Sequence, residues 1–262
     1  MSPSVPEPID QKRRRRTRIV RIIFSIWGTI AIGVLFNQFR TQNVDATFLR
    51  SSENVSVRAD GVSLEFHPKV KHATALLFYC GSGVEADAYA PMLRPISEQG
   101  FTTIIVKLPG RFAMLPGQKE AVLDTAQKLI QSQPEIRNWV ISGHSLGAAI
   151  SCKFVQKYPE STSALVLIGT THPKEDNLSD LTIPVTKVFG SVDGVAPIEK
   201  VEANRSLLPA STKWVRIEGA NHSQFGNYGH QLQDGSATIS REAQQSLVRE
   251  EILIRLKQLD NR

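Results

Sequence analysis

Apolar residues occur along most of the chain in two kinds of block, short runs of strand length and longer segments with helical spacing. The segments with helical spacing lie at residues 86–98, 118–131, 148–158 and 240–259. The short runs lie at residues 55–58, 62–66, 74–80, 101–108, 139–141, 164–168, 186–190 and 214–218. Since strands that alternate with helices form mostly parallel sheets, this order predicts an α/β fold with a doubly wound, mostly parallel sheet.

The first two strand-length runs differ from the later ones in how they are joined. Asp60 and Gly61 separate them, and this dipeptide is a strong signal for a tight hairpin turn. We therefore predict an antiparallel pair at one edge of the sheet. The run at 74–80 is apolar at nearly every position, which is typical of a strand buried on both faces.

Residues 22–39 form an uncharged segment that precedes these elements and is flanked by Arg21 and Arg40. Its length is close to the minimum for a helix that spans a bilayer. A buried core helix is disfavoured, because four consecutive arginines, at 13–16, precede the segment and the predicted α/β domain has no need of it.

Two further interpretations of this segment are a cleaved signal peptide and an uncleaved signal anchor. Residues 44–46, Val-Asp-Ala, resemble a cleavage site, but they end ten residues beyond Phe36, where the strongly apolar run stops. We predict the anchor, a single transmembrane helix with the basic tail at 1–21 in the cytoplasm. Residues 40–51 are then predicted to be a linker, and 52–262 a domain on the extracytoplasmic side.

The net charge of +6 is concentrated before the apolar segment. Residues 12–21 contain seven lysines and arginines, so the part of the chain that follows is nearly neutral. A nucleic-acid-binding domain carries a basic face of its own, and this charge distribution argues against one. We therefore expect no nucleic-acid partner.

Hydrophobic residues make up 41% of the 262 positions, enough for one domain with a substantial core. Of the two cysteines, Cys80 ends a predicted buried strand and Cys152 lies on a predicted helix, so both are expected to be packed thiols. The sequence has no metal-ligand spacing, and we expect no metal site.

The most informative motif is Gly-His-Ser-Leu-Gly at residues 143–147. A serine with a glycine two positions away on each side fits a strand-to-helix turn that is too tight for side chains at those positions. The strand predicted at 139–141 and the helix predicted at 148–158 supply the context that this turn requires. Because such a turn presents the hydroxyl to a substrate carbonyl, Ser145 is the candidate nucleophile.

A serine hydroxyl needs a base, and the base needs an acid that orients it. In this architecture the three residues follow one another as serine, acid and histidine. Asp193 lies in a glycine-lined turn just after the strand predicted at 186–190 and is the favoured acid. Asp176 and Asp180, which follow the preceding strand, are the alternatives.

His222 directly follows the last predicted strand, at 214–218, which is where a base able to reach Ser145 must come from. It is therefore the favoured base, and His230 is second. Lesser candidates are His144 within the motif and His172 after an earlier strand, whereas His67 and His72 lie too early in the chain.

A tetrahedral oxyanion needs two preorganised N–H donors. The backbone N–H of Leu146, next after the nucleophile, is one of them by geometry. The other is expected from the Gly-Ser-Gly sequence that follows the strand at 74–80. Ser82 is the first choice there, with Gly81 and Gly83 next.

The pieces with a recognisable pattern lie at residues 81–83, 88–91, 143–147, 190–194 and 221–226. From about residue 52 to its end, the chain resembles an α/β-hydrolase, and most of all the small branch related to dienelactone hydrolases. The resemblance implies a triad of Ser145, Asp193 and His222 and no cofactor. Dienelactone hydrolases have a cysteine where Ser145 stands, so their substrate is not carried over. Many lipases have His-Gly where this chain has Cys80-Gly81.

Only 17 residues lie between Ile168 and Thr186, too few for the lid domain that many lipases insert there. The site is therefore expected to be open or covered by short loops.

Residues 107–117, with Phe112, Met114 and Leu115, are equally consistent with an apolar acyl pocket and with a surface loop. Residues 228–239 are predicted to form an irregular loop near the candidate base, and the sequence assigns this loop no role.

The sequence thus predicts a membrane-anchored serine hydrolase that cleaves a carboxylic ester or a related acyl bond of a small-molecule substrate through an acyl-enzyme. An acyltransferase with the same triad is one alternative. A non-catalytic binding protein with the same fold is the other, because fold alone does not decide function. The sequence leaves the oligomeric state open.

Overall fold

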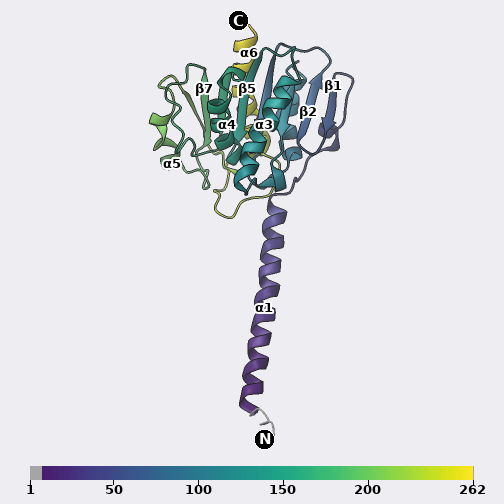
Figure 1. Ribbon diagram of the computed structural model, residues 1–262, viewed down its shortest axis with the longest axis vertical. Helices are drawn as coiled ribbons and strands as arrows, with labels where there is room; N and C mark the ends of the chain where they lie inside the picture. The colour runs from purple at the N-terminus through teal and green to yellow at the C-terminus, as the bar shows by residue number, and fades with distance from the viewer. Residues whose placement is uncertain (1–7, 262) are drawn as a thin grey trace. The chain divides into compact units, whose positions relative to one another are not determined.

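A computed structural model describes residues 8–261 of the chain. The chain divides into two compact units, Met1–Gln38 and Phe39–Arg262. The described part of the first unit is the single helix α1 (Pro8–Gln38). The second unit contains every strand and the remaining helices of the described residues (Figure 1).

Helix α1 is long and apolar enough, over Arg13–Val34, to cross a membrane by length and composition. Its large apolar side chains are exposed, with Phe24 at 80% and Trp27 at 68%. The arginines that precede the apolar segment lie on the same continuous helix, which therefore begins well before the predicted span at 22–39.

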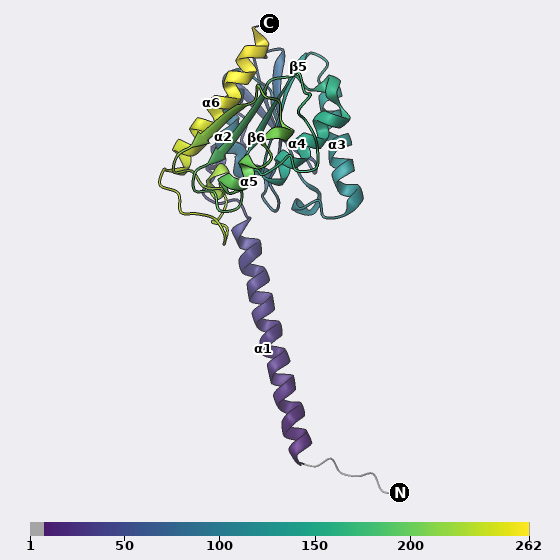
Figure 2. The same ribbon diagram turned by 90° about the vertical axis from the view of Figure 1, so that its left-hand side faces the viewer.

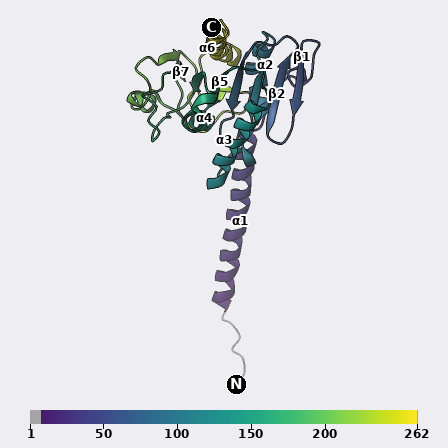
Figure 3. The ribbon, with the colours of Figure 1, turned by 45° about the horizontal axis from the view of Figure 1, so that its top comes forward.

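The second unit is built on one sheet of eight strands in the order β1-β2-β4-β3-β5-β6-β7-β8. Strand β2 pairs antiparallel with both β1 and β4, and the other neighbours pair in parallel. This confirms the predicted mostly parallel sheet with an antiparallel pair at one edge, which lies opposite β7 in Figure 3. The strands are β1 (Val55–Ala59), β2 (Ser63–Pro68), β3 (Thr74–Tyr79), β4 (Thr103–Val106), β5 (Asn138–His144), β6 (Ala164–Ile168), β7 (Val185–Gly190) and β8 (Lys213–Ile217).

Helices cover both faces of the sheet, as a doubly wound fold requires. Figure 2 shows α2 and α6 on one side and α3 and α4 on the other. The small helix α5 lies near β7. Their bounds are α2 (Ala90–Ser97), α3 (Pro116–Gln131), α4 (Leu146–Lys157), α5 (Ile198–Glu202) and α6 (Arg241–Asp260).

The core lies between these layers and is densest around the central strands. All six residues of β3 are buried, as its continuous apolar sequence predicts. Burying a leucine or phenylalanine contributes about 1.5–3 kcal/mol, so these strands fix the hydrophobic centre of the domain. Cys80 and Cys152 are free, buried thiols, also as predicted.

Helix α6 packs through a stripe of buried side chains spaced by four or three residues, Val248, Ile252, Leu256 and Leu259. The hydroxyl of Ser240 accepts a hydrogen bond from the N–H of Ala243 at 3.1 Å. Ser240 is therefore the N-cap of α6, and it ends the irregular loop that precedes the helix.

The helix predicted at 86–98 is divided in the structure. A 3-10 turn, η2 (Ala86–Tyr89), precedes α2, which begins at Ala90. Pro91 stands in the first turn of α2, where its missing N–H and fixed φ are tolerated. The division matters for the site, because it leaves Tyr89 buried beneath the candidate oxyanion loop.

The segment expected to be a linker, 40–51, folds onto the domain. The N–H of Thr41 donates to a carboxylate oxygen of Glu85 at 3.0 Å, and the N–H of Gln42 donates to the carbonyl of Asn227 at 2.7 Å. The buried guanidinium of Arg94 donates to carbonyls of the same segment. These partners lie far along the chain, so the local polar character of the segment could not reveal the contacts.

Candidate active site

Ser145 stands in a strained turn between β5 and α4. Its φ is 55° and its ψ is −116°, a combination that is rare for a residue with a side chain. A Cβ added at Gly143 would lie 2.3 Å from the carbonyl carbon of Gly147, and one added at Gly147 would lie 2.1 Å from the carbonyl oxygen of Tyr79. Both positions therefore require glycine, as the motif predicts for a tight elbow that presents a serine.

His222 and Asp193 lie in the loops that follow β8 and β7, and they are hydrogen bonded to one another. The distance from His222 Nδ1 to Asp193 Oδ2 is 2.9 Å, and both residues are buried. The other oxygen of Asp193 accepts the N–H groups of Val195 at 2.9 Å and Ala196 at 2.6 Å. The carboxylate is thus held by its own loop and aimed at the imidazole, which fixes the orientation of the ring.

The other imidazole nitrogen, His222 Nε2, is buried and has no hydrogen-bond partner within residues 8–261. A buried polar atom without a partner is unusual in a folded protein. With Nδ1 facing the carboxylate, Nε2 is the nitrogen free to accept a proton. The ring of His222 lies 4.5 Å, between centroids, from that of His144, which directly precedes Ser145.

The alternative acids make other contacts. Asp176 forms an ion pair with Lys153 at 3.1 Å, and Asp180 accepts a hydrogen bond from the hydroxyl of Ser179 at 3.3 Å. Among the described residues, Asp193 is the carboxylate whose oxygen bonds to the imidazole of His222.

The other candidate bases also lie in different settings. His67 bonds to Glu65 and His72 to Asp260, and His230 is exposed. His172 contacts the hydroxyl of Thr170 at 3.3 Å, and burial lowers the pKa of its imidazole to about 4.

His144 is fully buried behind the elbow, and its Nδ1 lies 3.0 Å from the hydroxyl of Tyr89. Burial, assisted by the neighbouring His222, lowers the pKa of His144 well below its usual value. The imidazole is therefore neutral at ordinary pH. It packs between the rings of His222 and Phe225, at 4.5 and 5.4 Å between centroids, and so helps to set the position of the candidate base.

The three candidates for the second oxyanion donor differ in whether their N–H groups are already bonded. The N–H of Gly81 donates to the hydroxyl of Tyr89 at 2.9 Å, and the N–H of Gly83 donates to the carbonyl of Arg111 at 2.7 Å. The N–H of Ser82 has no partner among the residues described. Neither has that of Leu146, which begins α4, where helix N–H groups lack acceptors within the helix.

Asp234 braces the candidate base, a role that the sequence did not indicate for the loop at 228–239. One of its oxygens accepts the backbone N–H groups of His222 at 3.0 Å and Gly194 at 3.2 Å. The other accepts both the N–H and the hydroxyl of Ser223 at 2.7 Å. Asp234 therefore joins the loop of the acid to the loop of the base. Aspartate is common in Gly/Ser-rich loops, so the sequence does not single out Asp234, and only the fold shows what it binds.

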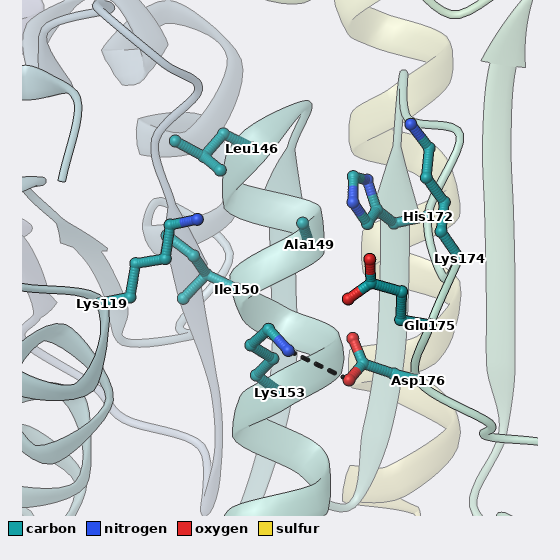
Figure 4. A pocket seen from close by; sticks show the side chains of 9 residues that line it. All are labelled: Lys119, Leu146, Ala149, Ile150, Lys153, His172, Lys174, Glu175 and Asp176. Atoms are coloured by element: carbon teal, nitrogen blue, oxygen red, sulfur yellow. Dashed lines mark hydrogen bonds and ion pairs between the residues drawn. The ribbon is translucent and has the colours of Figure 1, made fainter. Parts of the chain in front are cut away.

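A cavity of about 230 Å³ lies beside the first turn of α4 (Figure 4). Helix α4 forms one wall, the loop after β6 forms the facing wall, and Lys119 approaches from α3. Leu146, which directly follows the candidate nucleophile, lines this cavity. The lining residues are Lys119, Leu146, Ala149, Ile150, Lys153, His172, Lys174, Glu175 and Asp176.

The segment at 107–117 does not line this cavity. Met114 and Leu115 are 81% and 64% exposed, and Phe112 packs edge-on against Phe39 with 6.2 Å between ring centroids. Of the two interpretations of this segment, the surface loop is the one observed. The connection between β6 and β7 contains neither helix nor strand, so no lid domain lies there.

Within residues 8–261, no group of three or more His, Cys, Asp or Glu side chains is arranged to hold a metal ion.

Comparison with known proteins places this arrangement in a family. A curated relative, the monoacylglycerol lipase of Mycolicibacterium smegmatis, is 32% identical over 65 residues, which are 25% of this chain and 23% of that lipase. The aligned part thus spans less than a quarter of the relative.

Two solved structures share the fold. A thermophilic esterase from Thermogutta terrifontis has a TM-score of 0.57 at 14% identity, over 79% of this chain and 100% of the esterase. A bacterial membrane phospholipase A has a TM-score of 0.59 at 12% identity, over 95% of this chain and 100% of the phospholipase.

The sequence model of the alpha/beta hydrolase family matches residues 75–246, well over half of the chain. The matched region runs from β3 into α6 and includes the serine elbow and the loops that hold Asp193 and His222. The chain belongs to the alpha/beta hydrolase family.

Proposed function

We propose that the protein is a serine hydrolase that cleaves carboxylic esters with Ser145 as nucleophile, His222 as base and Asp193 as orienting acid. The main support is the buried hydrogen bond between His222 and Asp193, which leaves Nε2 of the same ring without a partner among the described residues. The ring of His222 also packs against that of His144 in the serine elbow. A carboxylate that orients an imidazole next to a strained serine is the arrangement that activates a hydroxyl.

In the proposed reaction, His222 Nε2 removes the proton of Ser145 as the serine oxygen attacks the ester carbonyl. The imidazolium formed is stabilised by Asp193, which is held by two backbone N–H groups. The negative oxygen of the tetrahedral intermediate accepts hydrogen bonds from the N–H groups of Leu146 and Ser82. The C–O bond to the alcohol then breaks, and the alcohol leaves with the proton from His222.

The second half of the reaction reverses these roles. His222 removes a proton from a water molecule, the water attacks the acyl-enzyme, and Ser145 leaves with the proton as the carboxylic acid is released. The N–H groups of Leu146 and Ser82 have no partner within residues 8–261, so they are available in both half-reactions without breaking other hydrogen bonds there.

The proposed substrate is an acyl ester of small or medium size. The absence of a lid between β6 and β7 leaves the site open, and the cavity of about 230 Å³ beside Leu146 has room for a part of such a molecule. The family membership and the names of the relatives, a monoacylglycerol lipase, an esterase and a phospholipase A, support ester hydrolysis as the reaction class.

The proposal includes an uncleaved membrane anchor in α1 with the catalytic domain on the extracytoplasmic side. The positive residues at one end of the apolar span favour the cytoplasmic location of that end. The cleavage-like sequence at 44–46 runs into the 3-10 turn η1 (Ala46–Leu49). Cleavage there would also detach Thr41 and Gln42, which are hydrogen bonded to the domain. The folded segment therefore favours the anchor over the signal peptide.

Labelling with a fluorophosphonate probe tests the proposed nucleophile, because the probe reacts with activated serines. Wild type is expected to be labelled at Ser145, and Ser145→Ala is expected to lose labelling and ester turnover by a factor of about 10⁴ or more while remaining folded. Ser82→Ala is the matched control, since its side chain has no proposed role and its backbone N–H is retained. Labelling of Ser145→Ala at the wild-type level would reject the assignment.

A further inference from the structure

The chain enters the catalytic domain between the two loops that flank the candidate site. Phe39, the first residue of the domain, packs against Phe112, and its ring lies so close to Gly83 that a Cβ there would be 2.9 Å away. Gly83 directly follows Ser82 in the candidate oxyanion loop. Thr41 forms a β-bridge with Tyr228, whose hydroxyl donates to the carbonyl of His222 at 3.2 Å.

This attachment limits how far the site can be from a membrane that holds α1. The apolar span ends at Val34, five residues before Phe39. Five residues extend over at most roughly 18 Å. Whatever direction the helix takes, the edge of the domain at Phe39 therefore lies within that distance of the end of the span.

The same edge carries the exposed apolar side chains of the loops around the site. Met114 and Leu115, at 81% and 64% exposed, lie in the loop that follows β4, and Leu232, at 76%, lies in the loop after His222. Val62, whose side chain is 43% exposed, lies at the same edge, because its carbonyl accepts the N–H of Lys107 just past the end of β4. Single exposed apolar residues are ordinary, but a group of them around one opening marks an interaction surface.

We propose that this edge of the domain lies on the bilayer surface, with Met114, Leu115 and Leu232 inserted at the acyl boundary, and that the site takes an amphiphilic acyl ester directly from the membrane. The substrate class rests on the hydrolase function proposed above. Apolar side chains of this kind favour the headgroup–acyl boundary. Because the anchor keeps the domain at the membrane, weak insertion is sufficient to hold this orientation.

An acyl ester in a bilayer has its polar end at the surface and its chain in the interior. A site whose opening faces that surface, with no lid domain over it, receives the ester group without complete extraction of the lipid into water. Met114 and Leu115 belong to the loop between β4 and α3, and Leu232 belongs to the loop that contains Asp234. Contact with the bilayer at these residues therefore involves a loop bonded to the candidate oxyanion loop and a loop bonded to the candidate base.

Turnover in proteoliposomes tests the proposal with two substrates. The full-length protein is assayed on 1-oleoylglycerol in phosphatidylcholine vesicles and on soluble p-nitrophenyl butyrate, with the outward-facing enzyme counted by fluorophosphonate labelling. The triple variant Met114→Asp, Leu115→Asp, Leu232→Asp is expected to lose at least fivefold in kcat/KM on the vesicle ester and less than twofold on the butyrate. Val70→Asp, equally exposed at 81% but before β3 at the opposite edge, is expected to change neither.

The outcomes separate the two proposals. Hydrolysis of neither ester by the wild type rejects the hydrolase function. Hydrolysis of the butyrate with an unchanged rate of the triple variant on vesicles rejects the membrane-facing edge alone. An equal loss on both substrates also rejects it, because the substitutions would then act on the site itself.

A fluorescence measurement tests, without any turnover, whether the edge that carries Leu115 lies at the membrane. Leu115→Cys and Val70→Cys are each labelled with the fluorophore NBD in the full-length protein and exposed to vesicles containing spin-labelled lipid. Label is directed to the introduced thiols, because Cys80 and Cys152 are buried and burial raises the pKa of Cys152 to about 12. Quenching at 115 is expected to exceed that at 70 at least threefold. Equal quenching at the two positions, or none at 115, overturns the proposal.

Discussion

At the residue scale, the candidate site depends on a few side chains that are fixed by hydrogen bonds from several loops. Asp193 is held by the N–H groups of Val195 and Ala196, and His222 is held from behind by Asp234. The bond between His222 and Asp193 joins two loops that are close in space because the parallel strands β7 and β8 end at the same edge of the sheet. Preorganisation of this kind places the imidazole before a substrate arrives, which is how an enzyme avoids reorganisation during reaction.

The acid is the residue that can be tested most sharply. Asp193→Asn keeps the shape of the side chain but removes the negative charge that stabilises a protonated His222, so kcat is expected to fall by about 10³–10⁴. Asp176→Asn is the control, because Asp176 pairs with Lys153 rather than with His222. The measurement is steady-state hydrolysis of p-nitrophenyl butyrate. A larger loss for Asp176→Asn than for Asp193→Asn would identify Asp176, and not Asp193, as the acid that orients His222.

At the element scale, strand β7 carries a charged side chain into the core. Lys187 is 1% exposed, and its ammonium donates to the carbonyl of His172. Among the residues described, it has no carboxylate in an ion pair with it. Burial lowers the pKa of Lys187 from 10.5 to about 7. The strand therefore contains a group whose ionisation is costly in the folded state.

This cost makes the stability of the domain depend on pH. Below about pH 7 the amine is protonated in both states, and the folded domain bears the full cost of the buried charge. Between about pH 7 and 10.5 the unfolded chain binds a proton that the folded domain does not bind, so the free energy of unfolding rises with pH.

Lys187→Met removes this dependence. At pH 6 the variant is expected to be more stable than the wild type, and the difference is expected to shrink by on the order of 3 kcal/mol toward pH 10. Urea unfolding of the full-length protein in detergent at pH 6 to 10 measures it. Lys200→Met, at an exposed position on α5, is the control and should parallel the wild type. Parallel curves for Lys187→Met and wild type would contradict the expectation.

At the scale of the whole molecule, the segment between the apolar span and the domain is part of the folded structure. Its contacts with Glu85 and Asn227 join it to the loops around the site, and Arg94 binds the carbonyls of Thr47 and Arg50. The start of the domain is therefore fixed at the edge that carries the candidate site rather than carried on a free tether. This placement is the basis for the proposed membrane-facing site.

The proposed uncleaved anchor has a direct experimental consequence. A protein tagged at both ends is expected to remain full length in the membrane fraction after alkaline extraction, because a helix embedded as proposed resists extraction and the cleavage-like sequence runs into the folded turn η1. Protease added to spheroplasts is expected to remove the C-terminal tag while a cytoplasmic marker stays intact. A shortened soluble form that begins at Thr47 would instead identify α1 as a signal peptide.

The sequence by itself determined the order of strands and helices, the antiparallel edge and the position of the serine turn. These features depend on local patterns: apolar periodicity sets which faces are buried, and only glycine fits at 143 and 147 because backbone atoms lie within 2.4 Å of where a Cβ would stand. The chain order of Ser145, Asp193 and His222 also follows from the sequence.

Only the tertiary structure decided which groups meet. The sequence placed Ser82 before Gly81 and Gly83 as the second oxyanion donor but could not show which N–H is available. Among the described residues, the hydroxyl of Tyr89 and the carbonyl of Arg111 accept the N–H groups of the two glycines, and that of Ser82 has no partner. Asp234 and the folded segment at 40–51 likewise acquire their contacts from residues distant in the chain. Hydrogen bonds between loops depend on where strands end in space, and a local sequence pattern contains no information about that distance.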